Sequence, residues 1–207
     1  MRYYIADCHF FHRSLLTKMD CRGFGSVDEM NETMINNWNS KVRSNDEVII
    51  LGDFSLGTAI QTAEVLDRLN GRLFLIRGNH DRFEKEKEYD CSQFGWIKDY
   101  EELNDNKRKV ILCHYPIPFY NLQYRIDEDE KPKTYMLYGH VHNTHDEKLL
   151  QEFIDKIKST VIVGPDGNEH LIPCQMINCF CGFSNYTPLT LDEWIENDRI
   201  RRSKISD

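Results

Sequence analysis

The 207-residue chain lacks a long hydrophobic run, so we expect no membrane-spanning helix. Its clearest apolar runs, such as residues 48–51 and 161–163, fall far short of the roughly 20 residues that span a bilayer. The N-terminal sequence MRYYIADCHF carries one positive charge, and its apolar stretch ends at Asp7, which is too short for a signal-peptide core. These absences predict a cytoplasmic protein without a membrane partner.

Basic residues are in the minority, because 26 Lys and Arg stand against 34 Asp and Glu and give a formal net charge of −8. Binding along duplex nucleic acid depends mainly on Lys and Arg that neutralise phosphates, so the composition favours a small or locally bound substrate. It does not exclude a nuclease, because bound metal cations would invert the field of an acidic site.

The chain also lacks the even set of cysteines that a disulfide framework needs. Its seven cysteines suit free thiols in a reducing compartment, and we expect no disulfide-linked partner. They are Cys8, Cys21, Cys91, Cys113, Cys174, Cys179 and Cys181. The last three lie in an apolar stretch, where small buried side chains are a simpler explanation than a metal or redox cluster.

What is present is the composition of one globular domain, with 40% hydrophobic and 29% charged residues. A chain of this length can build a single core, and we expect one domain over residues 1–207. Short apolar segments typical of buried strands alternate with segments of helical periodicity. The expected strands are residues 2–6, 47–51, 72–76, 109–113 and 134–138. This alternation predicts a layered α/β fold.

Residues 146–173 are expected to form a helix followed by a hairpin. Leu149, Leu150, Phe153, Ile154 and Ile157 share one face of this helix, which indicates packing against the domain. The segment fits an outer-layer insertion, an oligomer contact or a lid, because loops and insertions near a site decide specificity. The sequence does not predict an oligomeric state.

Each expected strand leads into polar side chains, and in a layered α/β fold such strand ends converge on a ligand site. These residues are Asp7, His9, Asp53, Asn79, His80, Asp81, His114, His140 and His142. Carboxylates, imidazoles and an amide are ligands for divalent metals, and seven such groups exceed the needs of one tetrahedral site. The count favours two metal ions, with Asp53 as the bridging carboxylate.

With these motifs in this order, the chain resembles the calcineurin-like metallophosphoesterase family, whose motifs run D-x-H, G-D, G-N-H-D or E, H and G-H-x-H. Five ordered motifs are far more specific than one. They read Asp7-Cys8-His9, Gly52-Asp53, Gly78-Asn79-His80-Asp81, His114 and Gly139-His140-Val141-His142. Small bacterial and phage-type members are more similar still, in segments 9–12, 26–31 and 186–193. The resemblance implies a four-layer α/β/β/α sandwich with two central mixed sheets.

The resemblance also implies a role for each motif residue. The first metal would be held by Asp7, His9, Asp53 and His142, and the second by Asp53, Asn79, His114 and His140. A hydroxide that bridges the metals would attack phosphorus in line, without a phosphoenzyme. His80 would assist the leaving group, and Asp81 would fix the tautomer and orientation of His80. Mn, Fe, Zn, Ni and Mg all suit these ligands.

Four assignments have a competing explanation. Asp81 would otherwise cap a following helix, and His12 suits either substrate contact or a structural role. Arg77 and Arg82 flank the turn at residues 78–81 and could clamp a phosphate, with Arg82 preferred, or they are ordinary solvated surface arginines.

The predicted function is hydrolysis of phosphodiesters or phosphomonoesters, with nucleotide-derived substrates among the candidates. Diesters are favoured because no cluster of arginines is evident for grasping a monoester. One alternative is a nuclease that acts on longer nucleic acid, which the acidic composition disfavours. Another is a metal-binding regulatory protein of the same fold without turnover, which would be favoured by a missing ligand or a replaced His80.

Overall fold

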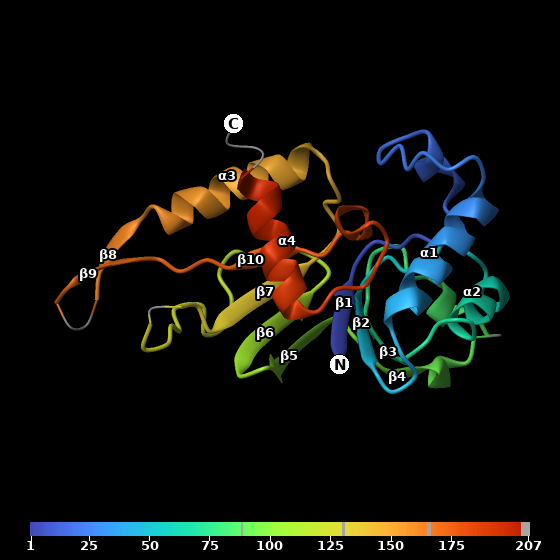
Figure 1. The fold of residues 1–207 in the computed structure, drawn as a ribbon, viewed down its shortest axis with the longest axis horizontal. Coiled ribbons are helices and arrows are strands. Elements are labelled where there is room, and N and C mark those ends of the chain that lie inside the picture. Colours follow the sequence, from blue (N-terminus) through green and yellow to red (C-terminus); the bar gives the residue numbers. More distant parts are fainter. Residues whose placement is uncertain (88, 130, 165–166, 204–207) are drawn as a thin grey trace.

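Two four-stranded β-sheets pack face to face in the computed structural model, which describes residues 1–87, 89–129, 131–164 and 167–203 (Figure 1). The first sheet has the order β1-β2-β3-β4, and each neighbouring pair is parallel. Its strands are β1 (Arg2–Ile5), β2 (Glu47–Leu51), β3 (Arg72–Ile76) and β4 (Phe94–Lys98). Beside β1, Leu189 forms an antiparallel bridge with Tyr4.

The second sheet has the order β10-β7-β6-β5 and is mixed. β5 runs antiparallel to β6, whereas β6, β7 and β10 run parallel to one another. Its strands are β5 (Tyr100–Asp105), β6 (Arg108–Cys113), β7 (Thr134–Tyr138) and β10 (Met176–Asn178). A separate hairpin of β8 (Val161–Val163) and β9 (Glu169–Leu171) projects from the body at the end opposite α1 and α2 (Figure 1).

Helices cover the outer faces of the two sheets. α1 (Val27–Lys41) and α2 (Ala59–Leu66) lie on the first sheet, and α3 (His145–Lys158) lies on the second (Figure 1). α4 (Leu191–Ser203) contacts both β1 and β10 and sends Trp194 into the core between the sheets. The short 3-10 helices are η1 (Arg13–Leu16), η2 (Phe83–Lys85), η3 (Cys91–Gln93) and η4 (Cys181–Ser184).

Alternation along the strands creates three separate layers of core. In β2, Val48 and Ile50 pack under α1 and α2, whereas Ile49 and Leu51 face the second sheet. In β6 and β7 the same period of two divides the residues between the inter-sheet core and the core under α3. The order helix, sheet, sheet, helix confirms the four-layer α/β/β/α sandwich.

The strands that the sequence did not reveal are those with little continuous apolar character. β5 reads YEELND, and all six residues are partly or largely exposed. β4 includes Gly95 and ends at an exposed lysine, and β10 is only three residues long. A short, polar or edge strand does not show the alternation on which sequence-based assignment depends.

The helix expected from residue 146 is present as α3, but only part of its expected apolar face is buried. Ile154 and Ile157 are 0% and 5% exposed, whereas Leu149 and Phe153 are 49% and 43% exposed. The expected apolar face therefore packs against the domain only in part, through Ile154, Ile157 and the partly buried Leu150. The part of α3 that contacts the second sheet is narrower than the apolar face of the helix.

Two further expectations from composition concern the membrane and the cysteines. Within the described ranges, no helix is both long enough and apolar enough to cross a bilayer. Six cysteines with described side chains are free thiols, and Cys174, Cys179 and Cys181 are buried in the core as expected.

The partly buried face of α3 gives a test of the packing. Ile154→Ala should lower the free energy of unfolding by about 3 kcal/mol, because it removes a fully buried side chain and leaves a cavity. Leu149→Ala, on the same helix, should change it by less than about 0.5 kcal/mol. Urea unfolding monitored by circular dichroism measures both, and similar losses in the two variants would contradict this packing.

Candidate metal centre

The carboxyl ends of five strands meet at one place, and the seven expected metal ligands lie there. Asp7 and His9 follow β1, Asp53 follows β2, Asn79 follows β3, His114 follows β6, and His140 and His142 follow β7. Backbone hydrogen bonds hold the ends of β1 and β7 together: Cys179 donates to Tyr138 and accepts from Ala6, both at 2.8 Å. The segment after β10 therefore joins the two sheets beside the site.

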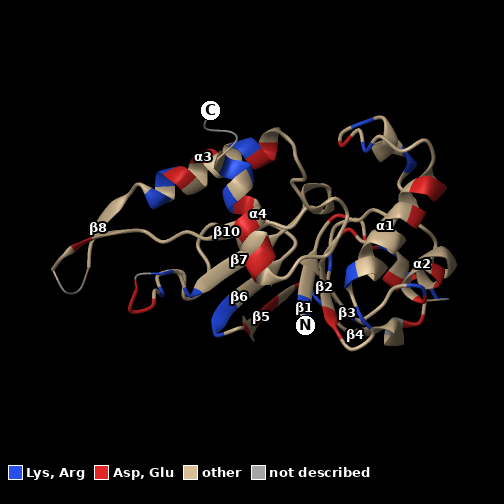
Figure 2. Ribbon diagram, viewed as in Figure 1, with Lys and Arg blue, Asp and Glu red and all other residues tan. Residues whose placement is uncertain are grey.

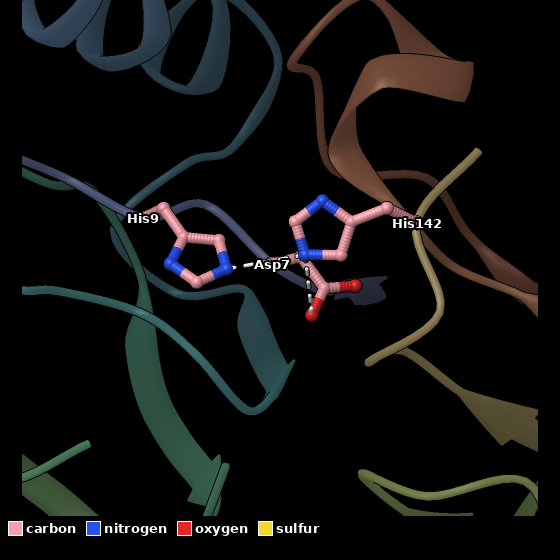
Figure 3. Close-up of side chains that lie close together, drawn as sticks. All are labelled: Asp7, His9 and His142. Atoms are coloured by element: carbon pink, nitrogen blue, oxygen red, sulfur yellow. Dashed lines mark hydrogen bonds and ion pairs between the residues drawn. The ribbon is translucent and has the colours of Figure 1, made fainter. Parts of the chain in front are cut away.

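Asp7, His9 and His142 form the first cluster of ligands, and their side chains point toward one another in Figure 3. The Nε2 atoms of His9 and His142 lie 3.1 Å apart, and His142 Nε2 lies 3.7 Å from Asp7 Oδ1. Two nitrogens that bind one tetrahedral metal at about 2.1 Å lie about 3.4 Å apart. The spacing in this cluster therefore suits coordination of one cation.

Asn79, His114 and His140 form the second cluster, and Asp53 lies between the two. Asn79 Oδ1 is 3.1 Å from His114 Nε2 and 3.0 Å from His140 Nδ1. The Oδ2 atom of Asp53 is 3.5 Å from His9 Nε2 and 3.6 Å from His114 Nε2. One carboxylate thus reaches an imidazole of each cluster, which is the geometry that a bridging ligand requires.

Burial sets the charge state of these ligands. It raises the pKa of Asp7 to about 7 and lowers the pKa of His9, His114 and His140. Neutral imidazoles keep a lone pair for a metal. A divalent cation would in turn favour the charged form of Asp7, so the donor set fits such an ion.

Two residues outside the motifs support the first cluster from behind. Asp20 lies 2.8 Å from Nδ1 of His142, so it accepts the ring proton and leaves Nε2 facing Asp7. Burial lowers the pKa of His142, but the hydrogen bond to Asp20 and the charge of Asp7 outweigh it and raise the pKa overall. Arg22 pairs with Asp20 and donates to the backbone carbonyls of Asp7 and Cys8.

Sequence reasoning missed Asp20 and Arg22 because no local spacing connects them with the site. Asp20 lies 122 residues from His142 along the chain. The surrounding loop has neither helical nor strand periodicity, and only the three-dimensional structure brings it against the ends of β1 and β7.

Five of the expected ligands occupy backbone conformations that residues other than glycine rarely adopt. The φ angles are 56° at Asp7, 51° at His9, 52° at Asp53, 71° at His140 and 48° at His142. Each left-handed residue costs about 1–3 kcal/mol, and such residues cluster at functional sites where the surrounding structure enforces them. The strands therefore end in sharp turns that direct these side chains inward.

Two glycines of the sequence motifs lie where an expected ligand occupies the space that their own side chain would fill. A Cβ atom on Gly78 would lie 2.1 Å from Oδ1 of Asp53, and one on Gly139 would lie 2.7 Å from Oδ2 of Asp7. Both distances are far below van der Waals contact. These two glycines let the strand ends approach closely enough to build the centre.

His80 and Asp81 lie in the loop after β3, but they do not form the expected pair. The His80 ring lies 5.4 Å from that of His9, and its backbone N–H donates to Asp53 Oδ1 at 2.8 Å. Asp81 accepts three backbone N–H groups at 2.7–2.8 Å, among them those of Asp53 and Gly78. Asp81 therefore supports the loop around Asp53, and the expectation that it orients the His80 ring needs correction.

The weaker candidates occupy different surroundings. His12 Nδ1 lies 3.3 Å from His9 Nδ1, and its Nε2 lies 2.8 Å from Ser14 Oγ. This position behind His9 favours support of a ligand over direct substrate contact. Arg77 is paired with two carboxylates, whereas the side chain of Arg82 is exposed near the site loop.

Comparison with known proteins identifies the family. Residues 4–165, which contain every expected ligand, match the calcineurin-like phosphoesterase superfamily domain. The chain belongs to this superfamily, whose members typically bind divalent metals and are usually hydrolases.

Two similar proteins extend the comparison beyond the matched domain. An uncharacterised protein of Methanocaldococcus jannaschii, MJ1445, is 34% identical over 206 residues, which cover 97% of this chain and 94% of that protein. The crystal structure of a protein of unknown function from Aquifex aeolicus, AQ665, has a TM-score of 0.62 at 21% identity and covers 93% of this chain and 96% of that one. The structural likeness shows a shared fold.

The close approach of Gly78 to Asp53 predicts a strong effect of one added methyl group. Gly78→Ala should displace Asp53 and weaken metal binding by more than the roughly 10- to 100-fold that follows loss of an outer-shell partner. Isothermal titration with Mn²⁺ measures the affinity. Gly167→Ala is the control, because its Cβ would meet no atom within 4 Å and the strain of its left-handed backbone, with φ 79°, falls in the β8–β9 hairpin. Unchanged binding in Gly78→Ala would refute the bridging position of Asp53.

The contact between Asp20 and His142 predicts a smaller loss. Asp20→Asn keeps the size of the side chain but removes the charge that holds the ring proton, so Mn²⁺ affinity should fall about tenfold. The exposed Asp28 provides the control, since Asp28→Asn makes the same change in net charge away from the ligands. Equal affinities in the two variants would show that Asp20 does not support the centre.

Proposed function

We propose that the chain is a phosphoesterase that uses two divalent metal ions to hydrolyse phosphodiester bonds. The proposal depends on the position of Asp53 between two clusters, within 3.6 Å of an imidazole nitrogen in each. One ion would be held by Asp7, His9, Asp53 and His142, and the other by Asp53, Asn79, His114 and His140. When bound, such ions supply an activated water and neutralise charge on the phosphate. Mn, Fe, Zn, Ni and Mg are the candidates.

His80 is the residue assigned to the leaving group. Its partly buried ring lies beside those of His9 and His12, with centroids 5.4 Å and 6.2 Å away. An imidazole N–H at this position can protonate the departing oxygen. Since Asp81 is engaged with backbone amides, the backbone bond from His80 to Asp53 and the neighbouring rings are left to fix its position.

The surroundings of the nearby arginines support a diester over a monoester. Arg77 is held by Glu84 at 2.5 Å and by Asp99 at 3.0 Å, and Arg22 is buried against Asp20. A monoester carries one more negative charge than a diester, and arginine forks are well suited to bind it. In this loop Arg82 is exposed, and it is the candidate for a single contact with the phosphate.

The charge distribution does not favour the nuclease alternative. Figure 2 shows Lys and Arg interspersed with Asp and Glu along α3, whereas α4 is acidic in its first part and basic near its end, and the net charge is −8. A protein that tracks a long nucleic acid needs a continuous basic groove. A nucleotide-sized ester suits this surface better than a polymer.

We also propose that residues 1–207 act as one catalytic domain in the reducing cytoplasm, with residues 146–173 as an insertion of the outer layer. α3 packs on the second sheet through Ile154 and Ile157. The hairpin lies at the opposite end of the molecule from α1 and α2 (Figure 1). These contacts support a packing role for the insertion more than a lid over the metal centre.

The assignment of His80 and Asp53 to different tasks can be tested with generic aryl phosphodiesters and phosphomonoesters. Chelator-stripped protein should regain turnover when Mn, Ni, Zn or Mg is returned singly, with the diester preferred. His80→Ala should bind both metals but lose about 100-fold or more in turnover, the scale of general acid catalysis. Asp53→Asn should lose metal and turnover together.

Metal content by mass spectrometry separates the outcomes. Equal metal loss in His80→Ala and Asp53→Asn would contradict the division of roles. Full metal binding by the wild-type protein without turnover on any ester would favour the metal-binding regulatory alternative.

A further inference from the structure

An aromatic side chain stands at the rim of the second ligand cluster. Tyr115 follows His114 directly, and its ring centroid lies 4.7 Å from that of His140 and 5.1 Å from that of His114. The ring planes are inclined by 65° and 71°. Tyr115 is 47% exposed. A tyrosine that is partly uncovered beside two expected ligands offers an aromatic surface to a molecule bound at the centre.

The loop after Tyr115 is anchored at two points, which fixes the backbone that carries this ring. Ile117 lies between two prolines and packs against the core under α3. Tyr120 is 7% exposed, and its hydroxyl accepts the backbone N–H of Gln175 at 2.7 Å. The proline after Tyr115 also restricts Tyr115 to extended backbone conformations. A ring on a fixed backbone that also packs against two imidazoles loses less conformational entropy when a ligand stacks on it.

Tyr115 and His80 adjoin different clusters of the centre. His80 lies beside His9, whereas Tyr115 lies beside His114 and His140. In the proposed function, His80 meets the oxygen that departs. A substituent that stays on phosphorus and lies over the second cluster would meet the ring of Tyr115.

We propose that Tyr115 is a specificity-determining residue that stacks against a planar aromatic group on the substituent retained by phosphorus. The inference rests on the proposed phosphodiesterase function and narrows its substrate class to diesters of nucleosides or of aryl alcohols. Stacking on an aromatic side chain recognises the face that every nucleobase presents, without requiring a particular base. The exposed ring needs no charge to do this, which suits a site with few free arginines.

The test compares two diesters with the same p-nitrophenolate leaving group, thymidine 5′-(p-nitrophenyl phosphate) and methyl p-nitrophenyl phosphate. In Tyr115→Leu, the ratio of kcat/KM for the thymidine ester to that for the methyl ester should fall about tenfold, mainly through KM, as expected for loss of one stacked base. Tyr115→Phe should keep the wild-type ratio. Tyr124→Leu is the matched control, since Tyr124 is 54% exposed but lines a groove beside the β8–β9 hairpin.

An unchanged ratio in Tyr115→Leu, whether both kcat/KM values fall equally or neither falls, would overturn the role of Tyr115. Equilibrium dialysis of thymidine 5′-methylphosphonate against the Mn²⁺-loaded protein supplies a second readout that needs no turnover. Tyr115→Leu should bind this compound about tenfold more weakly than wild type, and equal binding would again overturn the inference. Wild-type protein that hydrolyses neither ester would instead overturn the proposed function, so the two failures can be distinguished.

Discussion

Burial of the Asp53 carboxylate where the two sheets meet is the constraint on which the rest of the centre depends. Asp53 is 2% exposed, and a buried carboxylate is costly unless it is paired and hydrogen-bonded. The chain supplies one backbone N–H from His80 and two nearby imidazoles. These groups offset only part of the charge, because burial keeps His9 and His114 neutral. Divalent cations would supply the rest, so metal binding and local stability are linked.

A second set of carboxylates makes this arrangement rigid. Asp81 gathers backbone amides around Asp53, and Asp20 holds the ring of His142. Neither needs to touch substrate to matter, because loops with left-handed residues keep their shape only when the surrounding contacts enforce it. Asp81, the last residue of the G-N-H-D motif, therefore supports the loop around Asp53. This role accounts for the burial of Asp81 better than a contact with His80 would.

The positions of the strand ends could be predicted from the sequence, because a buried parallel strand and the polar residues that follow it form a local pattern. β2, β3 and β7 were predictable to the residue, and the seven expected ligands converge, five of them in two candidate metal-binding groups and Asn79 and His140 through their contacts with one another and with His114. β5 was not predictable because its residues are polar and partly exposed. Asp20 and Arg22 were not predictable because their partners are distant along the chain. The direction of the Asp81 side chain was misjudged because adjacency to His80 says nothing about which groups its carboxylate meets.

The contacts that fix the expected metal ligands also limit which arginines are free to meet a phosphate. Arg22 is committed to the backbone of Asp7 and Cys8, and Arg77 is committed to two carboxylates. Cations used for support are not free to bind substrate charge, so in the proposed function phosphate recognition would fall mainly to the bound metals. Binding energy that distinguishes one ester from another must then come from the organic part of the substrate. Uncharged surfaces at the rim, with Tyr115 the most directly placed, are where such discrimination can arise.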